Sequence, residues 1–207
     1  MTRKTTLTLI LGASLLVGWT TFAVADSKVR MWAKRCVKCH GDNGNSDKDK
    51  VPSIAGISSK YFMTTMKDYK KKKRVGETFR YKTTRGRNAS TDMNAVAKRL
   101  NSRKLKALGD YFAAQTFIPR VQDFDFYLAR EGENVHQKRC EKCHEDNGRS
   151  PDNDSGILAG QWKPYLESEL ELFVSGERKT PKKMKKQLDK LKSGDIPALL
   201  HFFASQQ

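Results

Sequence analysis

Four cysteines and two histidines form the most informative pattern in this sequence. The segments Cys36-Val37-Lys38-Cys39-His40 and Cys140-Glu141-Lys142-Cys143-His144 are two copies of C-x-x-C-H, and together they contain every cysteine of the chain. In this motif the two thiols form thioethers with the vinyl groups of a porphyrin, and the adjacent imidazole reaches the iron from the same side. The pattern therefore predicts two covalently attached hemes of the c type. His40 and His144 are the predicted proximal iron ligands, and the predicted thioether residues are Cys36, Cys39, Cys140 and Cys143.

Other uses of four cysteines explain the pattern less well. A disulfide framework or a redox C-x-x-C pair is an ordinary interpretation for an exported chain. Neither explains why a histidine follows both motifs directly. A closed zinc site needs four ligands, and the spacing offers no matching second pair.

The second motif leaves few candidates for the distal iron ligand, which in electron-transfer cytochromes is usually Met or His. Met184 is the only methionine of the second half of the chain. His136 and His201 are the other candidates for the distal ligand of the second heme. His136 precedes Cys140 by one helical turn, so it is poorly placed to reach the opposite heme face. His201 falls inside an expected helix, where a packing or surface role is simpler. Met184 is the predicted ligand.

The first motif has more competitors for the same role. Met31 lies upstream of the cysteines, and Met63 and Met66 lie on an apolar segment suited to packing against the heme ring. Met93 aligns with Met184 in the internal repeat described below and is the predicted ligand. Two His/Met pairs leave no open coordination position, which favours electron transfer over peroxide or oxygen chemistry.

The chain is an internal duplication. Cys140 follows Cys36 by 104 residues, and at the same offset Ile54-Ala55-Gly56 matches Leu158-Ala159-Gly160. Further on the offset becomes 91, which aligns Met93 with Met184 and Tyr111-Phe112 with Phe202-Phe203. The change in offset places 13 extra residues in the first copy. The duplication therefore predicts two tandem domains of one kind. Each domain is short, and its heme would supply part of the apolar core.

The predicted fold is all-α, with two tandem class I cytochrome c domains at 26–119 and 120–207. Apolar residues at helical spacing predict helices over 102–115 and 194–206, and a further helix over 27–39 would lead into the first cysteines. Pro197 would lie in the first turn of the last helix, where it is tolerated. No segment shows persuasive strand alternation.

Turn residues follow each heme motif. Asp42-Asn43-Gly44 and Asp146-Asn147-Gly148 are turn signals just past the heme-binding segments. Pro52 is expected to precede a tight turn whose carbonyl accepts from His40, and Ser155-Gly156 is a weaker counterpart in the second copy. Trp162 is expected either to pack on the second heme or to serve as ordinary core.

Residues 1–25 have the pattern of a secretory signal peptide. Arg3 and Lys4 precede an apolar run over 7–17, and Ala23-Val24-Ala25 offers a small-residue cleavage site. An uncleaved membrane anchor is the alternative, but the run is short and interrupted by polar residues. Cleavage near Ala25 would place the mature protein in the periplasm, as a protein that does not span the membrane.

The charge is distributed unequally between the two copies. The whole chain carries a net charge of +17, and counting gives +15 for 26–119 and zero for 120–207. A periplasmic location makes nucleic acid an improbable partner. A basic surface instead fits a soluble acidic redox partner, anionic lipid headgroups, or a solvated face with no partner. The candidate docking residues are Lys70, Lys71, Lys72, Lys73 and Arg74 in the first copy and Lys182 and Lys183 in the second.

The sequence resembles the bacterial diheme cytochromes c of the c-four type. It bears a closer resemblance to the diheme subunit of flavocytochrome c sulfide dehydrogenase than to that type. The resemblance is carried by the second heme motif, by Ile157-Leu158-Ala159-Gly160-Gln161-Trp162, by the connector Gln115-Thr116-Phe117-Ile118-Pro119 and by the ending Phe203-Ala204-Ser205-Gln206-Gln207. It implies His40/Met93 and His144/Met184 as the iron ligands. The basic first domain departs from the family pattern.

The resemblance also implies a function and a partner. In that family a separate FAD-containing subunit oxidises sulfide, and the diheme subunit carries the electrons onward to an external acceptor. This chain has no G-x-G-x-x-G fingerprint for FAD, so it would not be catalytic alone. The alternatives are a free-standing diheme shuttle that delivers electrons to a terminal oxidase, and a diheme enzyme such as a peroxidase or thiosulfate dehydrogenase.

Overall fold

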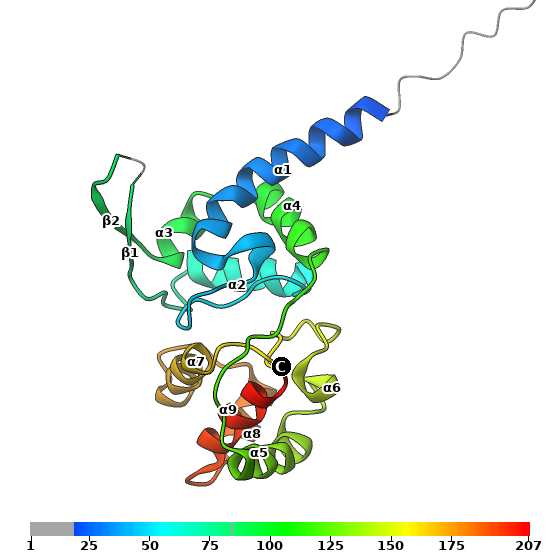
Figure 1. Cartoon of the computed structure of the whole chain (residues 1–207), viewed down its shortest axis with the longest axis vertical. Helices are drawn as coiled ribbons and strands as arrows, with labels where there is room; N and C mark the ends of the chain where they lie inside the picture. Colours follow the sequence, from blue (N-terminus) through cyan, green and yellow to red (C-terminus); the bar gives the residue numbers. More distant parts are fainter. Residues whose placement is uncertain (1–18, 84) are drawn as a thin grey trace, which may run out of the picture.

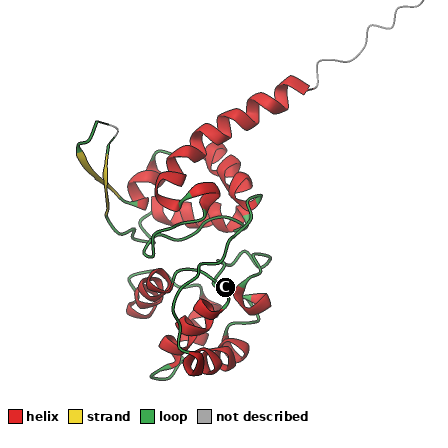
Figure 2. Ribbon diagram, viewed as in Figure 1, coloured by secondary structure: helices red, strands yellow, loops and turns green. Residues whose placement is uncertain are grey.

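A computed structural model describes residues 19–83 and 85–207, with side chains of the helical residues from 27 onward. Most of these residues are helical, and the helices form two bodies joined by one connector (Figures 1 and 2). The predicted signal peptide lies largely outside the described residues. Within those residues, no helix is long and apolar enough to cross a membrane.

The first body packs its helices around one apolar cluster. Its elements are α1 (Trp19–His40), η1 (Asp42–Gly44), α2 (Ser59–Lys70), β1 (Phe79–Lys82), β2 (Asn88–Thr91), α3 (Met93–Lys98) and α4 (Ser102–Ala113). Phe62 of α2 and Phe112 of α4 stack at a centroid distance of 5.9 Å. Cys36, Met63 and Met93 pack against the buried residues of this cluster. The helix predicted over 102–115 is confirmed as α4 within two residues, whereas the helix predicted over 27–39 lies inside the longer α1, which begins eight residues earlier.

The second body repeats this order without the strands. Its elements are α5 (Phe126–Arg139), α6 (Glu145–Gly148), α7 (Lys163–Ser175), α8 (Lys182–Leu188) and α9 (Asp195–Ser205). α5 and α9 approach closely at Gly132, where a Cβ atom would lie 2.0 Å from the carbonyl oxygen of Ala198. Pro197 is the third residue of α9, as predicted.

The repeated Ile-Ala-Gly and Leu-Ala-Gly segments have one structural role in both bodies. The carbonyl oxygen of Gly44 accepts from the amides of Ile54 and Ala55, at 2.7 and 3.1 Å. In the second body the carbonyl oxygen of Gly148 accepts in the same way from Leu158 and Ala159. Gly44 and Gly148 have φ values of 86° and 87°, a conformation that favours glycine. The turn after each heme motif is thus tied to the segment that follows it.

The extra residues of the first copy form a β-hairpin, which the sequence-based prediction of an all-α chain did not include. β1 and β2 pair antiparallel with Phe79 opposite Thr91 and Lys82 opposite Asn88. Figure 1 shows the hairpin extending away from the helices. β1 is almost entirely exposed, so it has no buried face to produce the alternation by which a strand is recognised.

The two bodies share a polar, partly buried interface. Gln161 donates through Nε2 to the carbonyl oxygen of Ser53 and accepts from the Ser53 amide, both at 3.0 Å. Trp162 Nε1 donates to the carbonyl oxygen of Ser46 at 2.9 Å. Ile157 of the second body is buried within the apolar cluster of the first. The two domains are therefore held in one arrangement by backbone and side-chain contacts.

Candidate heme sites

The first heme motif ends α1, and its histidine is the last residue of that helix. His40 is buried, and its Nδ1 lies 2.8 Å from the carbonyl oxygen of Pro52. A carbonyl acceptor for His40 at this turn is as expected, and the structure shows that the acceptor is Pro52 itself. With Nδ1 as the donor to the carbonyl, the unprotonated Nε2 is the nitrogen available to a metal.

The second heme motif has the same arrangement with looser geometry. α5 ends at Arg139, so Cys140 and Cys143 lie in the following turn and His144 caps α6. Nδ1 of His144 lies 3.3 Å from the carbonyl oxygen of Gly156, the weaker counterpart expected from the sequence. The two predicted proximal ligands are therefore oriented alike, and the first is held more tightly.

Burial favours the uncharged forms of the two predicted proximal histidines and of Cys36, Cys39 and Cys140. It lowers the pKa of His40, and it lowers the pKa of His144 to about 4. Burial also raises the pKa of Cys36 and of Cys140 to about 11 each. The four cysteines are free thiols rather than disulfides. Neutral imidazoles with Nδ1 fixed and pairs of free thiols are the groups that a covalent heme requires, so the residues fit this cofactor.

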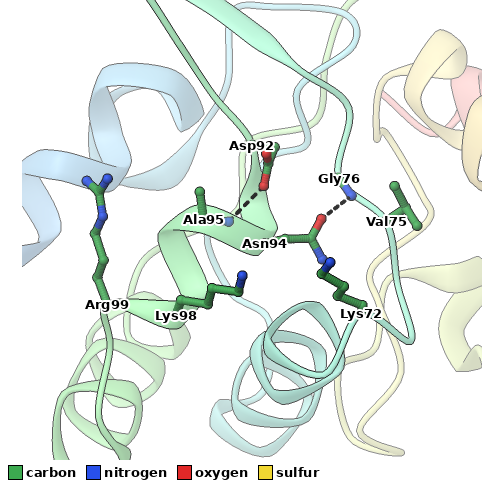
Figure 3. Close-up of a pocket in the computed structure, with 8 residues that line it drawn as sticks. All are labelled: Lys72, Val75, Gly76, Asp92, Asn94, Ala95, Lys98 and Arg99. Carbon is green, nitrogen blue, oxygen red and sulfur yellow. Dashed lines mark hydrogen bonds between the residues drawn. The ribbon is translucent and has the colours of Figure 1, made fainter.

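Met93, the predicted distal ligand of the first heme, is the first residue of α3. Figure 3 shows its two neighbours in the chain, Asp92 and Asn94, with their hydrogen bonds to Ala95 and Gly76. Asp92 caps this helix by accepting from the amide of Ala95 at 2.7 Å. Asn94 accepts from the amide of Gly76 at 2.9 Å and donates to the carbonyl oxygens of Tyr69 and Arg74. A side chain on Gly76 would collide with the Met93 backbone. The α2–β1 loop thus holds the start of α3 in place.

Met184, the predicted distal ligand of the second heme, lies in α8. It is half-buried, whereas the lysines on either side of it are exposed. These lysines are Lys182, Lys183, Lys185 and Lys186. α8 occupies the same place in the order of elements as α3, in agreement with the alignment of Met184 and Met93.

The competing methionines and histidines have other surroundings. Met31 is 58% exposed, and Met66 is buried in the first apolar cluster. His136 is fully buried between the rings of Phe202 and Phe203 and bonds through Nε2 to Glu141 at 2.6 Å. Nδ1 of His201 accepts from the backbone amide of Asp125 at 2.7 Å. Both histidines therefore have structural partners.

The predicted basic docking residues divide into two groups. Lys70, Lys71, Lys72 and Lys73 are exposed, as are Lys182 and Lys183. Arg74 is 3% exposed, so the prediction that it belongs to a docking surface is wrong. Its guanidinium lies over the ring of Tyr69, donates to Tyr165 Oη at 2.9 Å and forms an ion pair with Glu169. The position of Arg74 at the end of a lysine run predicts an exposed side chain. Arg74 is buried because Glu169 of the second domain provides a carboxylate partner for it.

The interface residues were the ones that sequence reasoning did not identify. The sequence predicts that Trp162 packs on the second heme or in a core, and it does not predict the hydrogen bond that Nε1 donates to Ser46 of the first domain. The sequence gives Gln161 no predicted role beyond its place in the Ile157–Trp162 motif. In the structure it is 3% exposed and forms hydrogen bonds with both the amide and the carbonyl oxygen of Ser53. A polar side chain beside a repeated Ala-Gly pair gave no sign of this contact.

Comparisons with known proteins agree with the geometry. Residues 25–114 match the family model described as Cytochrome c. The chain is 29% identical to cytochrome c-552 of Acidithiobacillus ferridurans over 69% of its length and 61% of that protein, so it spans less than two thirds of this relative. It is 28% identical to cytochrome c4 of Azotobacter vinelandii over 69% of each chain.

A solved structure extends the likeness to both domains. Cytochrome c4 of Acidithiobacillus ferrooxidans superposes with a TM-score of 0.67 at 26% identity, covering 83% of this chain and 99% of the other. A match over 83% of this chain is too long for one body alone, so it extends over both. The two-domain arrangement is therefore the one that a solved cytochrome c4 adopts.

Proposed function

Because the chain is a diheme c-type cytochrome with the tandem-domain fold of the cytochromes c4, we propose that it is a periplasmic electron-transfer protein. Each of its two covalently bound hemes supplies one-electron chemistry. The domains extend over 26–119 and 120–207, and the signal peptide is removed near Ala25. The protein is a carrier rather than a catalyst.

One observation carries this proposal: each domain presents one neutral histidine and one methionine in equivalent elements. His40 and His144 are fixed through Nδ1 to a backbone carbonyl, and Met93 and Met184 lie in the short helices α3 and α8. We assign these four residues as axial ligands and the four cysteines as the attachment points. Two protein ligands per iron exclude water and substrate from the metal, as an electron carrier requires.

We further propose an electron donor for this carrier. The motifs shared with the diheme subunit of flavocytochrome c sulfide dehydrogenase support an FAD-containing, sulfide-oxidising flavoprotein subunit as that donor. The electrons then pass to an external acceptor. The relatives named cytochrome c4 favour a second candidate, a free-standing diheme shuttle that serves a terminal oxidase or another redox partner.

A pull-down of the tagged mature protein from periplasmic extract tests the donor. The flavin absorbance and fluorescence of the purified material are read beside the heme bands. A stoichiometric flavoprotein whose flavin bleaches with sulfide is the expected result. A heme protein that emerges alone and is still reduced and oxidised reversibly would replace the flavoprotein proposal with the free shuttle.

Exposed cations mark the surfaces that we propose for an acidic redox partner. The first surface consists of Lys70, Lys71, Lys72 and Lys73, and the second consists of the four lysines flanking Met184. Arg80, Lys82, Arg85 and Arg87 of the hairpin region are also exposed and add to the charge of the first domain. Such surfaces raise the association rate with an acidic protein in a salt-dependent manner.

Replacing the four lysines of the first surface by Gln should slow electron exchange with an acidic partner by about tenfold at low ionic strength. The matched variant carries Gln at Lys182, Lys183, Lys185 and Lys186, so both variants lose the same formal charge. Stopped-flow rates as a function of salt provide the measurement. If the two variants keep the wild-type rates and the wild-type salt dependence, both surfaces are solvated faces without a partner.

A further inference from the structure

One peptide group of the first domain is bonded on both sides, by His40 and by the second domain. The carbonyl oxygen of Pro52 lies 2.8 Å from Nδ1 of His40, and the amide of Ser53 donates to Oε1 of Gln161 at 3.0 Å. This carbonyl and this amide belong to the same planar peptide unit. A continuous hydrogen-bond chain therefore runs from a side chain of the second domain to the predicted proximal ligand of the first heme.

The contacts of Gln161 leave little freedom in how its amide is oriented. Nε2 donates to the carbonyl oxygen of Ser53 at 3.0 Å, and Oε1 also accepts from the amide of Trp162 at 3.2 Å. With Nε2 facing a carbonyl and Oε1 facing two amides, the opposite orientation would leave several groups unpaired. Gln161 and Ser53 are 3% and 2% exposed, so water does not compete well for these bonds.

The bond to Gln161 strengthens the bond to His40. An amide that donates a hydrogen bond is polarised, and its carbonyl oxygen becomes a better acceptor, an effect that is larger in a buried site. A stronger bond at Nδ1 gives the imidazole more negative character and makes it a better electron donor to a metal on Nε2. Electron donation stabilises ferric iron relative to ferrous iron, so this chain of bonds would lower the reduction potential of a heme whose iron is held by His40.

We propose that Gln161 is a positioning residue through which the second domain sets the reduction potential of the first heme. The proposal rests on the assignment of His40 as an axial ligand, but not on the identity of any redox partner. It makes the first potential depend on the docked arrangement of the two domains.

In the part of the chain that the structure describes, the second heme motif has no equivalent contact. Nδ1 of His144 lies 3.3 Å from the carbonyl oxygen of Gly156, and the amide that completes this peptide unit belongs to Ile157. Among the residues that the structure describes, no hydrogen bond from this amide to the first domain is present. The hydrogen-bond chain described here therefore links the second domain to His40, and the described residues show no matching chain from the first domain to His144.

The test compares two variants of the holoprotein. Gln161→Leu removes both bonds to Ser53 at nearly constant volume. Trp162→Phe removes the neighbouring interdomain bond to Ser46 and leaves the Pro52–Ser53 peptide unit intact. Spectroelectrochemical titration gives the two potentials, and the NMR signals of the ligand methionine methyl groups during partial reduction assign them to the domains.

We expect Gln161→Leu to raise the potential of the first heme and to leave that of the second unchanged. The Nδ1 proton of His40 should exchange with solvent about fivefold faster, because the variant weakens the hydrogen bond between this proton and the carbonyl oxygen of Pro52. Trp162→Phe should change neither potential. If Gln161→Leu folds poorly, Gln161→Met provides the same loss of hydrogen bonding on an unbranched side chain.

Three results would overturn the proposal. The first is an unchanged reduction potential of the first heme in the folded Gln161 variants. The second is an equal shift in the potentials of both hemes, and the third is a shift of the first heme's potential in Trp162→Phe equal to that in Gln161→Leu. The last two would show that Gln161 acts only by holding the interface together. Because isolated holoprotein is used, these results are independent of whether a flavoprotein donor exists.

Discussion

Replacing Met184 by Ala should convert one of the two hemes from a low-spin to a high-spin or differently ligated form. A methionine sulfur on ferric iron gives a weak charge-transfer band in the red, and the variant should lose about half of its intensity. The potential of the second heme should fall, because methionine favours the reduced iron. Visible spectroscopy and a redox titration of the purified holoprotein measure both effects.

The other methionines of the chain provide the controls for this result. Met93→Ala should produce the same change at the first heme, and the double variant should lose the band completely. Met31→Ala should leave the spectrum unchanged, because Met31 is exposed on α1. An unaltered spectrum in Met184→Ala would remove Met184 from the iron, and an altered one in Met31→Ala would reopen the choice in the first domain.

Replacing Arg74 by Gln should destabilise the protein by about 3 kcal/mol, because it breaks a buried ion pair. The side chains of Arg74 and Glu169 are 4% and 12% exposed, and the pair joins the two domains. Arg178 also forms an ion pair with Glu169, so the buried carboxylate keeps one cationic partner in the variant. The expected loss of stability is therefore at the lower end of the range for broken buried ion pairs. Thermal unfolding of the holoprotein, followed by circular dichroism, is the measurement.

An exposed ion pair in the second domain is the matched control. Lys185 and Asp189 lie one helical turn apart at 2.7 Å, with side chains 64% and 57% exposed. Lys185→Gln should change the stability by less than about 0.5 kcal/mol, as surface pairs usually do. If Arg74→Gln behaves like Lys185→Gln, the buried pair does not contribute to holding the domains together.

Local patterns predicted those parts of the site that depend on short stretches of chain. The two C-x-x-C-H motifs indicated the cofactor because the attachment chemistry needs those residue types at that spacing. A carbonyl of the turn near Pro52 was predicted to accept from His40, and the structure identifies the acceptor as the carbonyl oxygen of Pro52. The repeat offsets of 104 and 91 predicted both the duplication and the position of the insertion.

The hairpin shows why part of the fold could not be predicted. Phe79 to Lys82 is exposed at most positions, so its pairing with Asn88 to Thr91 produces no hydrophobic alternation. A strand without a buried face is formed by pairing between backbones, and composition alone does not reveal such pairing.

Only the tertiary structure decided how the two domains meet. By itself the sequence determined two heme domains of one kind, their helical order and the candidate iron ligands, because periodicity and motif spacing are properties of consecutive residues. Arg74, Gln161 and Trp162 acquired their roles from residues about 90 or more positions away in the chain. The environment of a polar side chain is set by what packs against it in space, and a single sequence does not encode that contact in any local pattern.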